Sequence, residues 1–269
     1  MRCLLWLICL LWVSTLPANA AEKTMIDFKV EENEVVFSYL PLDSGECAIL
    51  HLPNNRNFLI NAGVKEDEEE IFQFLRQFHI EKLDGILLTS MVNSTTIQNL
   101  QKKYGMEELV LLAPLTINAK SLFLKQTTIS KGEKWSIDEG VEIEVNYEGE
   151  GVNFLIKFHN HELFWMENLN ENIEGIHLNQ ELQKVNILKL PLWSKSYFVS
   201  DKFIHHLDAQ TAVIGNNGTV IKKNEDLLEA FYETWVDVYF TKQNGLISIK
   251  FNKNNYEVLT FPKNSFIDK

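Results

Sequence analysis

Cysteine, basic side chains and long apolar runs are all scarce in this sequence. Only three of the 269 residues are cysteines, and 25 Lys and Arg stand against 37 Asp and Glu, which gives a formal net charge of −12. Nucleic acids and anionic lipid surfaces bind clustered Lys and Arg, so this acid excess argues against both as partners. With 45% hydrophobic and 23% charged residues, the composition predicts a globular core and excludes a disordered, collagenous or polytopic membrane chain.

The longest apolar run is too short to span a membrane and predicts an export signal instead. Arg2 precedes the apolar run Cys3–Val13, and the small-residue pattern Ala18-Asn19-Ala20 follows it. This layout is typical of a secretory signal peptide cleaved after Ala20, whereas a membrane anchor needs about 20 apolar residues. We therefore expect residues 1–20 to be a signal peptide and the mature chain to be secreted, with no stable membrane insertion.

Removal of the signal leaves Cys47 as the only cysteine, so the mature chain cannot form an internal disulfide. Arg2 is the only charge lost, and 24 basic against 37 acidic residues leave a net charge of −13. No repeat, low-complexity tract or linker rich in Pro, Gly or Ser divides the remainder. We expect residues 21–269 to form one domain held together by core packing. A disulfide between two chains through Cys47 stays open.

Short apolar segments alternate with amphipathic ones along the mature chain, which predicts an α/β fold. Helices are expected over residues 68–78, 97–103, 201–207 and 226–234. Strands are expected over residues 35–40, 47–52, 57–62, 85–89, 110–113, 126–129, 134–137, 141–147, 154–158, 163–166, 185–189, 211–214, 236–240, 246–251 and 256–260. This order favours two sheets covered by helices. The acidic residues 66–70 are interpreted as a solvated helix start.

Five segments, in the right order over roughly residues 33–260, resemble a metallo-β-lactamase-fold domain of the type found in ComEC-type competence proteins. They are Gly45–Pro53 with Phe58–Gly63, Leu83–Thr89, Leu163–Asn168, Asn186–Pro191 and Val238–Ile249. The resemblance implies a four-layer αββα sandwich. It also implies a site where His and Asp side chains bind metal ions, which lower the pKa of bound water and produce a hydroxide nucleophile.

The residues that would bind metal in such a site are replaced in this sequence. In the family motif T-H-x-H-x-D-H, which begins here at Thr89, three His positions and one Asp position have changed. Asn61 and Asn168 stand where two further Asp ligands would be, and an apolar pair replaces the His pair of H-H-G-S. The positions of this degenerate metal cleft that we take as the candidate site are Ser90, Val92, Ser94, Thr95, Asn168, Leu192 and Trp193. Neutral hydroxyls are poor Zn²⁺ ligands, so we expect no metal and no cofactor there.

Other residues offer only weak alternatives for catalysis. His159 and His161 fall between two expected strands and are interpreted as a solvated hairpin turn. His205 and His206 are interpreted as surface residues of a helix whose buried face lies elsewhere. Cys47 and His51 are four strand positions apart, about 13 Å, so they cannot form a nucleophile–base pair, and Cys47 is expected to be a packing residue.

Aromatic side chains follow the lost His pair, and they leave two interpretations open. Trp193, Tyr197 and Phe198 either fill the emptied cleft or form an exposed patch that binds a partner. The sequence thus favours a secreted, metal-free and non-catalytic binding or structural module, with an unknown protein or small molecule as its partner. The alternative is a phosphodiesterase-like or nuclease-like hydrolase with a relocated site built from His159, His161, His205 or His206. A DNA-binding role in competence is disfavoured by the net charge.

Overall fold

The computed structural model describes residues 25–90, 94–113, 125–149, 151–180, 182, 185–191, 199–215 and 225–266. The expected signal peptide, residues 1–20, lies outside the described residues, as do Val92, Leu192 and Trp193 of the candidate site. None of the helices in the described ranges is long and apolar enough to cross a membrane.

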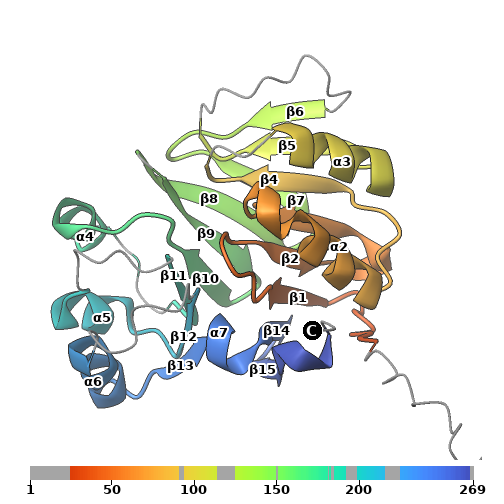
Figure 1. Cartoon of the computed structure of the whole chain (residues 1–269). Helices are drawn as coiled ribbons and strands as arrows, with labels where there is room; N and C mark the ends of the chain where they lie inside the picture. The colour runs from red at the N-terminus through yellow and green to blue at the C-terminus, as the bar shows by residue number, and fades with distance from the viewer. Residues whose placement is uncertain are drawn as a thin grey trace, which may run out of the picture.

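The described residues form two sheets that pack face to face (Figure 1). The eight-stranded sheet has the order β15 (Tyr256–Phe261), β14 (Leu246–Asn252), β1 (Glu34–Tyr39), β2 (Ala48–His51), β3 (Asn57–Ile60), β4 (Gly85–Leu88), β5 (Glu108–Leu111) and β6 (Lys125–Thr128). The seven-stranded sheet has the order β13 (Asp237–Phe240), β12 (Thr211–Ile214), β11 (Ile187–Leu190), β10 (His161–Trp165), β9 (Val152–Phe158), β8 (Val141–Glu148) and β7 (Lys134–Asp138).

Each sheet changes from antiparallel to parallel pairing near its middle. Strands β3 to β6 are parallel to one another, as are β10 to β13, whereas the remaining neighbours are antiparallel. The hairpin between β2 and β3 turns at Pro53–Asn55, between the strands expected over 47–52 and 57–62. In open α/β sheets, ligands bind beyond the carboxyl ends of parallel strands. The ends of β3, β4, β10 and β11 are therefore the places to look for a site.

Helices cover the outer face of each sheet, which completes four layers. Figure 1 shows α2 (Glu68–Gln77) and α3 (Ser94–Tyr104) beside the eight-stranded sheet. It shows α4 (Glu171–His177), α5 (Asp201–Leu207) and α6 (Glu225–Glu233) beside the other sheet, with α7 (Thr241–Asn244) between β13 and β14. This confirms the predicted αββα sandwich.

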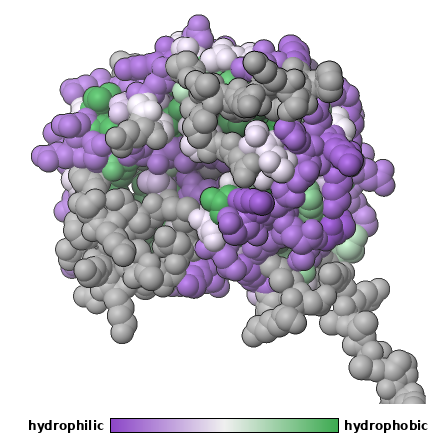
Figure 2. All heavy atoms as spheres, turned by 45° about the horizontal axis from the view of Figure 1, so that its top comes forward, coloured by the Kyte–Doolittle hydropathy of each residue, from purple (hydrophilic) through white to green (hydrophobic). Residues whose placement is uncertain are grey.

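Three buried apolar clusters in the described residues match the three interfaces between these layers. In β1, Val35, Phe37 and Tyr39 point between the sheets, and in β2 Ile49 packs under α2 and α3. A third cluster joins the seven-stranded sheet to α5 and α6. The alternation follows from the pleat, since successive strand side chains point to opposite faces. Figure 2 shows a face on which the coloured atoms are mostly hydrophilic, as expected for a chain whose apolar residues are buried.

The acidic start of α2 differs from the prediction of a solvated segment. Asp67 is buried, and its carboxylate accepts hydrogen bonds from the backbone amides of Ser44, Gly45 and Val64 at 3.3, 2.8 and 2.9 Å. Buried amides need acceptors, and a carboxylate satisfies several at once. Asp67 therefore fixes the loop between β1 and β2 against the start of α2.

Candidate functional site

The candidate site lies where the carboxyl ends of β3 and β4 meet the carboxyl end of β10 from the other sheet. Asn61 directly follows β3, Thr89 follows β4, and Glu167 lies two residues after the end of β10. The Nδ2 atom of Asn61 donates to Oε1 of Glu167 at 3.0 Å, so one hydrogen bond joins the two sheets at this point. Asn61, which the sequence placed at a lost ligand position of the metal cleft, thus bridges to the other sheet with its side chain.

Asn61 is held in one orientation by its neighbours. Its Nδ2 also donates to Oγ1 of Thr89 at 2.8 Å, and its Oδ1 accepts the backbone N–H of Thr89 at 3.0 Å. Its backbone φ of 60° is in the left-handed region, which Asn tolerates better than most residues. The amide oxygen is used within the protein and the amide nitrogen is a donor, so this side chain is a poor substitute for an Asp ligand.

Lys189 brings a positive charge into the buried space beside Asn61. It lies on the face of β11 that points between the sheets, and only 2% of the residue is exposed. Its Nζ contacts Oε2 of Glu46, donates to the carbonyl of Met166 at 3.1 Å and lies 3.7 Å from Oε1 of Glu167. The same ammonium lies 4.6 Å from the centre of the Trp165 ring, a cation–π contact. Trp165 Nε1 donates to Glu167 in turn.

We call Glu46, Asn61, Thr89, Glu167 and Lys189 the inter-sheet polar network. Its carboxylates are occupied by the Lys189 ammonium, the Asn61 amide and the indole of Trp165. A divalent cation prefers ligands that are free, anionic or imidazole, and an adjacent ammonium repels it. In the part of the chain that the structure describes, no three His, Cys, Asp or Glu side chains are grouped closely enough to hold a metal ion. The described residues therefore do not fit the metal centre that the resemblance implies.

The remaining predicted site residues have different positions around this network. Ser90 follows Thr89 and is half-buried, whereas Ser94 and Thr95 begin α3. Asn168 is half-buried beside Glu167, and its backbone N–H and C=O both bond the side chain of Asn153, at 3.1 and 2.9 Å. The structure thus brings Asn168 next to the network through its backbone.

A buried histidine supports this loop and was not foreseen as part of the site. His177 in α4 is fully buried; its Nδ1 donates to Oε1 of Gln180 and its Nε2 accepts from Asn153 Nδ2, at 2.7 and 2.8 Å. Asn153 in turn accepts the backbone N–H groups of Glu167 and Asn168. Burial lowers the pKa of His177, so the neutral ring that this chain of hydrogen bonds requires is favoured.

The alternative histidines do not converge on a site. His161 contradicts the prediction of a solvated turn: it is the first residue of β10, is 6% exposed and packs against Phe251 with ring centres 5.4 Å apart. Both its ring nitrogens lack a hydrogen-bond partner among the described residues. His159 is exposed in the turn before it, His205 is exposed on α5, and His206 contacts the carbonyl of Gln180 at 3.1 Å.

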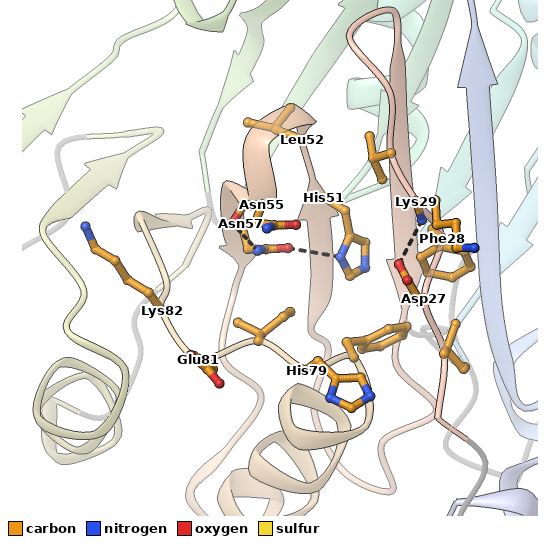
Figure 3. A pocket seen from close by; sticks show the side chains of 14 residues that line it. Asp27, Phe28, Lys29, His51, Leu52, Asn55, Asn57, His79, Glu81 and Lys82 are labelled. Atoms are coloured by element: carbon orange, nitrogen blue, oxygen red, sulfur yellow. Dashed lines mark hydrogen bonds between the residues drawn. The ribbon is translucent and has the colours of Figure 1, made fainter.

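A pocket of about 670 Å³ lies at the amino end of β3, opposite the end that Asn61 follows (Figure 3). The half-buried ring of Phe28 and the buried rings of His51 and Phe78 form one wall, with centroids 4.8 to 5.6 Å apart. His51 contacts Oδ1 of Asn57 through Nδ1 and Oγ of Ser38 through Nε2, both at 3.0 Å. Burial lowers the pKa of His51 to about 4, so the ring is neutral at physiological pH. No pattern in the sequence predicted this pocket.

Comparison with known proteins identifies the architecture. No family model matches the sequence, and no curated protein matches it. Among solved structures, the Zn²⁺-bound PqqB of Methylobacterium extorquens matches with a TM-score of 0.50 and 13% identity over 73% of this chain and 85% of that one. The long form of RNase Z from yeast matches with a TM-score of 0.56 and 10% identity over 84% of this chain. This chain spans 49% of that longer protein.

These similarities are structural only, because the sequence identities are far below the level at which function can be transferred. A further match, to the short form of human tRNase Z, has a TM-score of 0.41 and 8% identity over 66% of this chain and 91% of that one. The two matches at 0.50 and above show a shared fold. This chain therefore has the metallo-β-lactamase fold.

Proposed function

We propose that this chain is a secreted, degenerate ComEC-type protein of the metallo-β-lactamase fold that acts as a binding or structural module, without metal, cofactor or hydrolytic activity. The observation that carries this proposal is the place of Lys189, whose buried ammonium contacts Glu46 and lies near Glu167 at the strand ends. A fixed ammonium supplies the positive charge there. It has no open coordination position for water.

The chemistry of a hydrolase on this fold explains why an ammonium in place of a metal ion matters. Hydrolysis would need a metal ion to lower the pKa of a bound water towards neutrality. Lys189 uses its donors on Glu46 and Met166, and Asn61 uses its amide on Thr89 and Glu167. A second candidate, a hydrolase with a relocated histidine site, gains no support from the positions of His159, His161, His205 and His206.

Metal analysis of the purified protein tests the proposal. After incubation with Zn²⁺ or Mn²⁺ and removal of free ions, we expect substoichiometric metal and an unfolding temperature that neither ion nor chelator changes. A ligand that binds only the folded state raises the unfolding temperature, so an unchanged value reports an absent site. Hydrolysis of bis(p-nitrophenyl) phosphate should not exceed the buffer rate. One tightly bound Zn, Mn or Fe per chain, with activity lost on chelation, would overturn the proposal.

The pocket beside His51 supports the binding part of the proposal. Its volume of about 670 Å³ is within the range of small-molecule sites. Figure 3 shows the side chains of Asn55, His79 and Glu81 around this space, so polar groups are available beside the aromatic wall. Asp27 and Glu81 balance Lys29 and Lys82 in charge, and we therefore expect a neutral ligand rather than a strongly ionic one.

A further inference from the structure

Two aromatic side chains at the end of α6 are exposed far more than any other large hydrophobic residue that the structure describes. Trp235 is 92% exposed and Tyr232 is 84% exposed, whereas the next most exposed, Met25, reaches 50%. Exposed Trp and Tyr are the residues most often found at the centre of protein interfaces. Their separation of three positions, across the last turn of a helix, places both at the same end of α6.

The backbone at Trp235 is unfavourable for that residue. The N–H of Val236 donates to the carbonyl of Phe231 at 3.0 Å, and the N–H of Trp235 donates to the carbonyl of Tyr232 at 3.2 Å. This is the Schellman ending of a helix, in which the residue at the position of Trp235 is left-handed and is usually Gly. Trp235 has φ of 59°, so a bulky residue holds a conformation that only Gly adopts freely.

The charge around the two aromatics indicates what they bind. Residues 225–241 contain five acidic residues and no Lys, Arg or His. Among them Glu229, Glu233 and Asp237 are exposed, and Glu229 lies one helical turn before both Tyr232 and Glu233. A cationic side chain gains from both an aromatic face and nearby carboxylates. A second copy of this acidic chain or an anionic membrane would instead be repelled.

We propose that this aromatic–acidic patch, formed by Glu229, Tyr232, Glu233, Trp235 and Asp237, binds a segment of a partner protein rich in Lys or Arg. Strand β13 begins within the patch at Asp237 and is the outermost strand of its sheet in the described part of the chain. The N–H of Phe240 donates to Oδ1 of Asn244 at 2.8 Å, and the other outer backbone groups of β13 would pair with an extended segment, which favours a polypeptide over a small free cation. The inference does not depend on whether the strand ends at Asn61 hold a metal.

A substitution can separate binding from stability at this position. Trp235→Gly relieves the left-handed backbone, so we expect the unfolding temperature to rise by about 2–4 °C. The same variant should bind a fluorescein-labelled peptide of alternating arginine and serine about tenfold more weakly, as measured by fluorescence anisotropy at low salt. Glu233→Gln should also weaken binding and reduce its salt dependence.

The turn before β10 offers a matched control for that variant. His159 is also an exposed residue with a ring side chain and a left-handed backbone, with φ of 52°. His159→Gly should therefore raise the unfolding temperature similarly and leave peptide binding unchanged. Wild-type affinity in the folded Trp235→Gly variant would overturn the inference. So would a wild-type protein that fails to bind the peptide but forms dimers or binds anionic vesicles through Trp235.

Discussion

At the scale of single residues, Lys189 determines the character of the candidate site. Removing an ammonium from water costs several kcal/mol unless partners compensate. Here the partners are the carboxylates of Glu46 and Glu167, the carbonyl of Met166 and the face of Trp165. Because these partners come from both sheets, the charge is also part of what fixes the sheets to each other.

Loss of the ammonium should therefore be costly. Lys189→Met would leave two half-buried carboxylates without their cation, and we expect the free energy of unfolding in urea to fall by about 3 kcal/mol. Lys157 provides the control, because it also lies near two carboxylates, Glu144 at 3.2 Å and Glu162 at 3.6 Å, but at the surface. Lys157→Met should cost less than about 1 kcal/mol. Equal losses in the two variants would show that Lys189 does not act as proposed.

His51 should make stability depend on pH. Burial lowers its pKa to about 4 in the folded chain, whereas the unfolded chain takes up the proton near 6.5. Between these values the unfolded state binds more protons, so this contribution is fully present above pH 6.5 and is lost as the pH falls towards 4. The full effect is on the order of 3 kcal/mol.

Urea unfolding at several pH values between 7 and 4 measures this effect. His51→Gln removes the titrating ring while keeping a donor and an acceptor for Asn57 and Ser38, so its stability should decline less steeply below pH 6.5 than that of the wild type. Parallel declines in the two proteins would show that His51 is not the group responsible. Titration of the imidazole by NMR gives an independent check.

Residues in motifs were easier to predict than residues in networks. Asn61 and Asn168 were located because the sequence around them resembles a known pattern. Lys189 and Glu46 are 143 positions apart, and nothing in a single sequence indicates that such residues meet. The role of His177 could not be predicted for the same reason, since it lies in α4 and its partner Asn153 lies in β9. Side-chain pairing across two sheets depends on the tertiary structure, which local patterns do not contain.

At the scale of elements, tight connections matter as much as the regular segments. Gly245 joins α7 to β14 with φ of 78°, and a Cβ there would lie 2.2 Å from the carbonyl oxygen of Phe261. Gly132 has a similar φ of 82°, but a Cβ there would meet nothing within 4 Å. Substitution of Gly132 would therefore cause backbone strain alone, whereas substitution of Gly245 would cause backbone strain and a steric clash.

These two glycines should respond differently to alanine. Gly132→Ala adds only the cost of a left-handed backbone, about 1–2 kcal/mol. Gly245→Ala adds the clash with β15 as well, so we expect it to cost clearly more in urea unfolding at neutral pH. Similar losses in the two variants would mean that the hairpin of β14 and β15 shifts to accept the methyl group.

Most elements could be predicted because their apolar spacing is regular. Helix α5 has the range 201–207 that the sequence predicts, and it begins after Ser200, whose side chain accepts the N–H of Phe203 at 3.2 Å. Helix α4 was missed although Asn170 caps it in the same way, because seven residues give too little periodicity to recognise. Helix α7 was missed because its four residues fall between two expected strands.

At the scale of the whole molecule, the three buried apolar clusters stabilise the described structure without a disulfide. Cys47 is buried under α2, its thiol lies 3.3 Å from the carbonyl of Asn61, and burial raises its pKa, with the Asp67 carboxylate adding to the effect. A thiolate, the reactive form, is therefore disfavoured while the chain is folded.

Cys47 should report global unfolding. We expect Ellman's reagent to leave the folded mature protein unmodified, and to react fully once urea has unfolded it. The rate of modification at low urea should follow the opening of the whole fold rather than a local fluctuation. Rapid modification without denaturant, or a disulfide-linked dimer in the oxidised protein, would show that the loop before β2 opens on its own.

The fold itself was predictable because ordered segments along the chain resemble a known architecture, even though each segment alone is weak. The pocket beside His51 was not, because it is lined by residues from three separate stretches, near Phe28, His51 and Phe78. Cavities arise where packed elements fail to fill space, and that depends on the final arrangement of all of them.

The position of β1 has a consequence for how the chain is completed. In the register of the sheet, Tyr39 pairs with Ala48 on one side and with Ile247 on the other, about 200 positions later. Until the last hairpin is made, β1 presents a bare row of amides and carbonyls flanked by Val35 and Phe37. A protease that cleaved the chain before β14 would therefore leave a fragment with an unpaired strand edge. Such fragments should aggregate and precipitate rather than stay in solution.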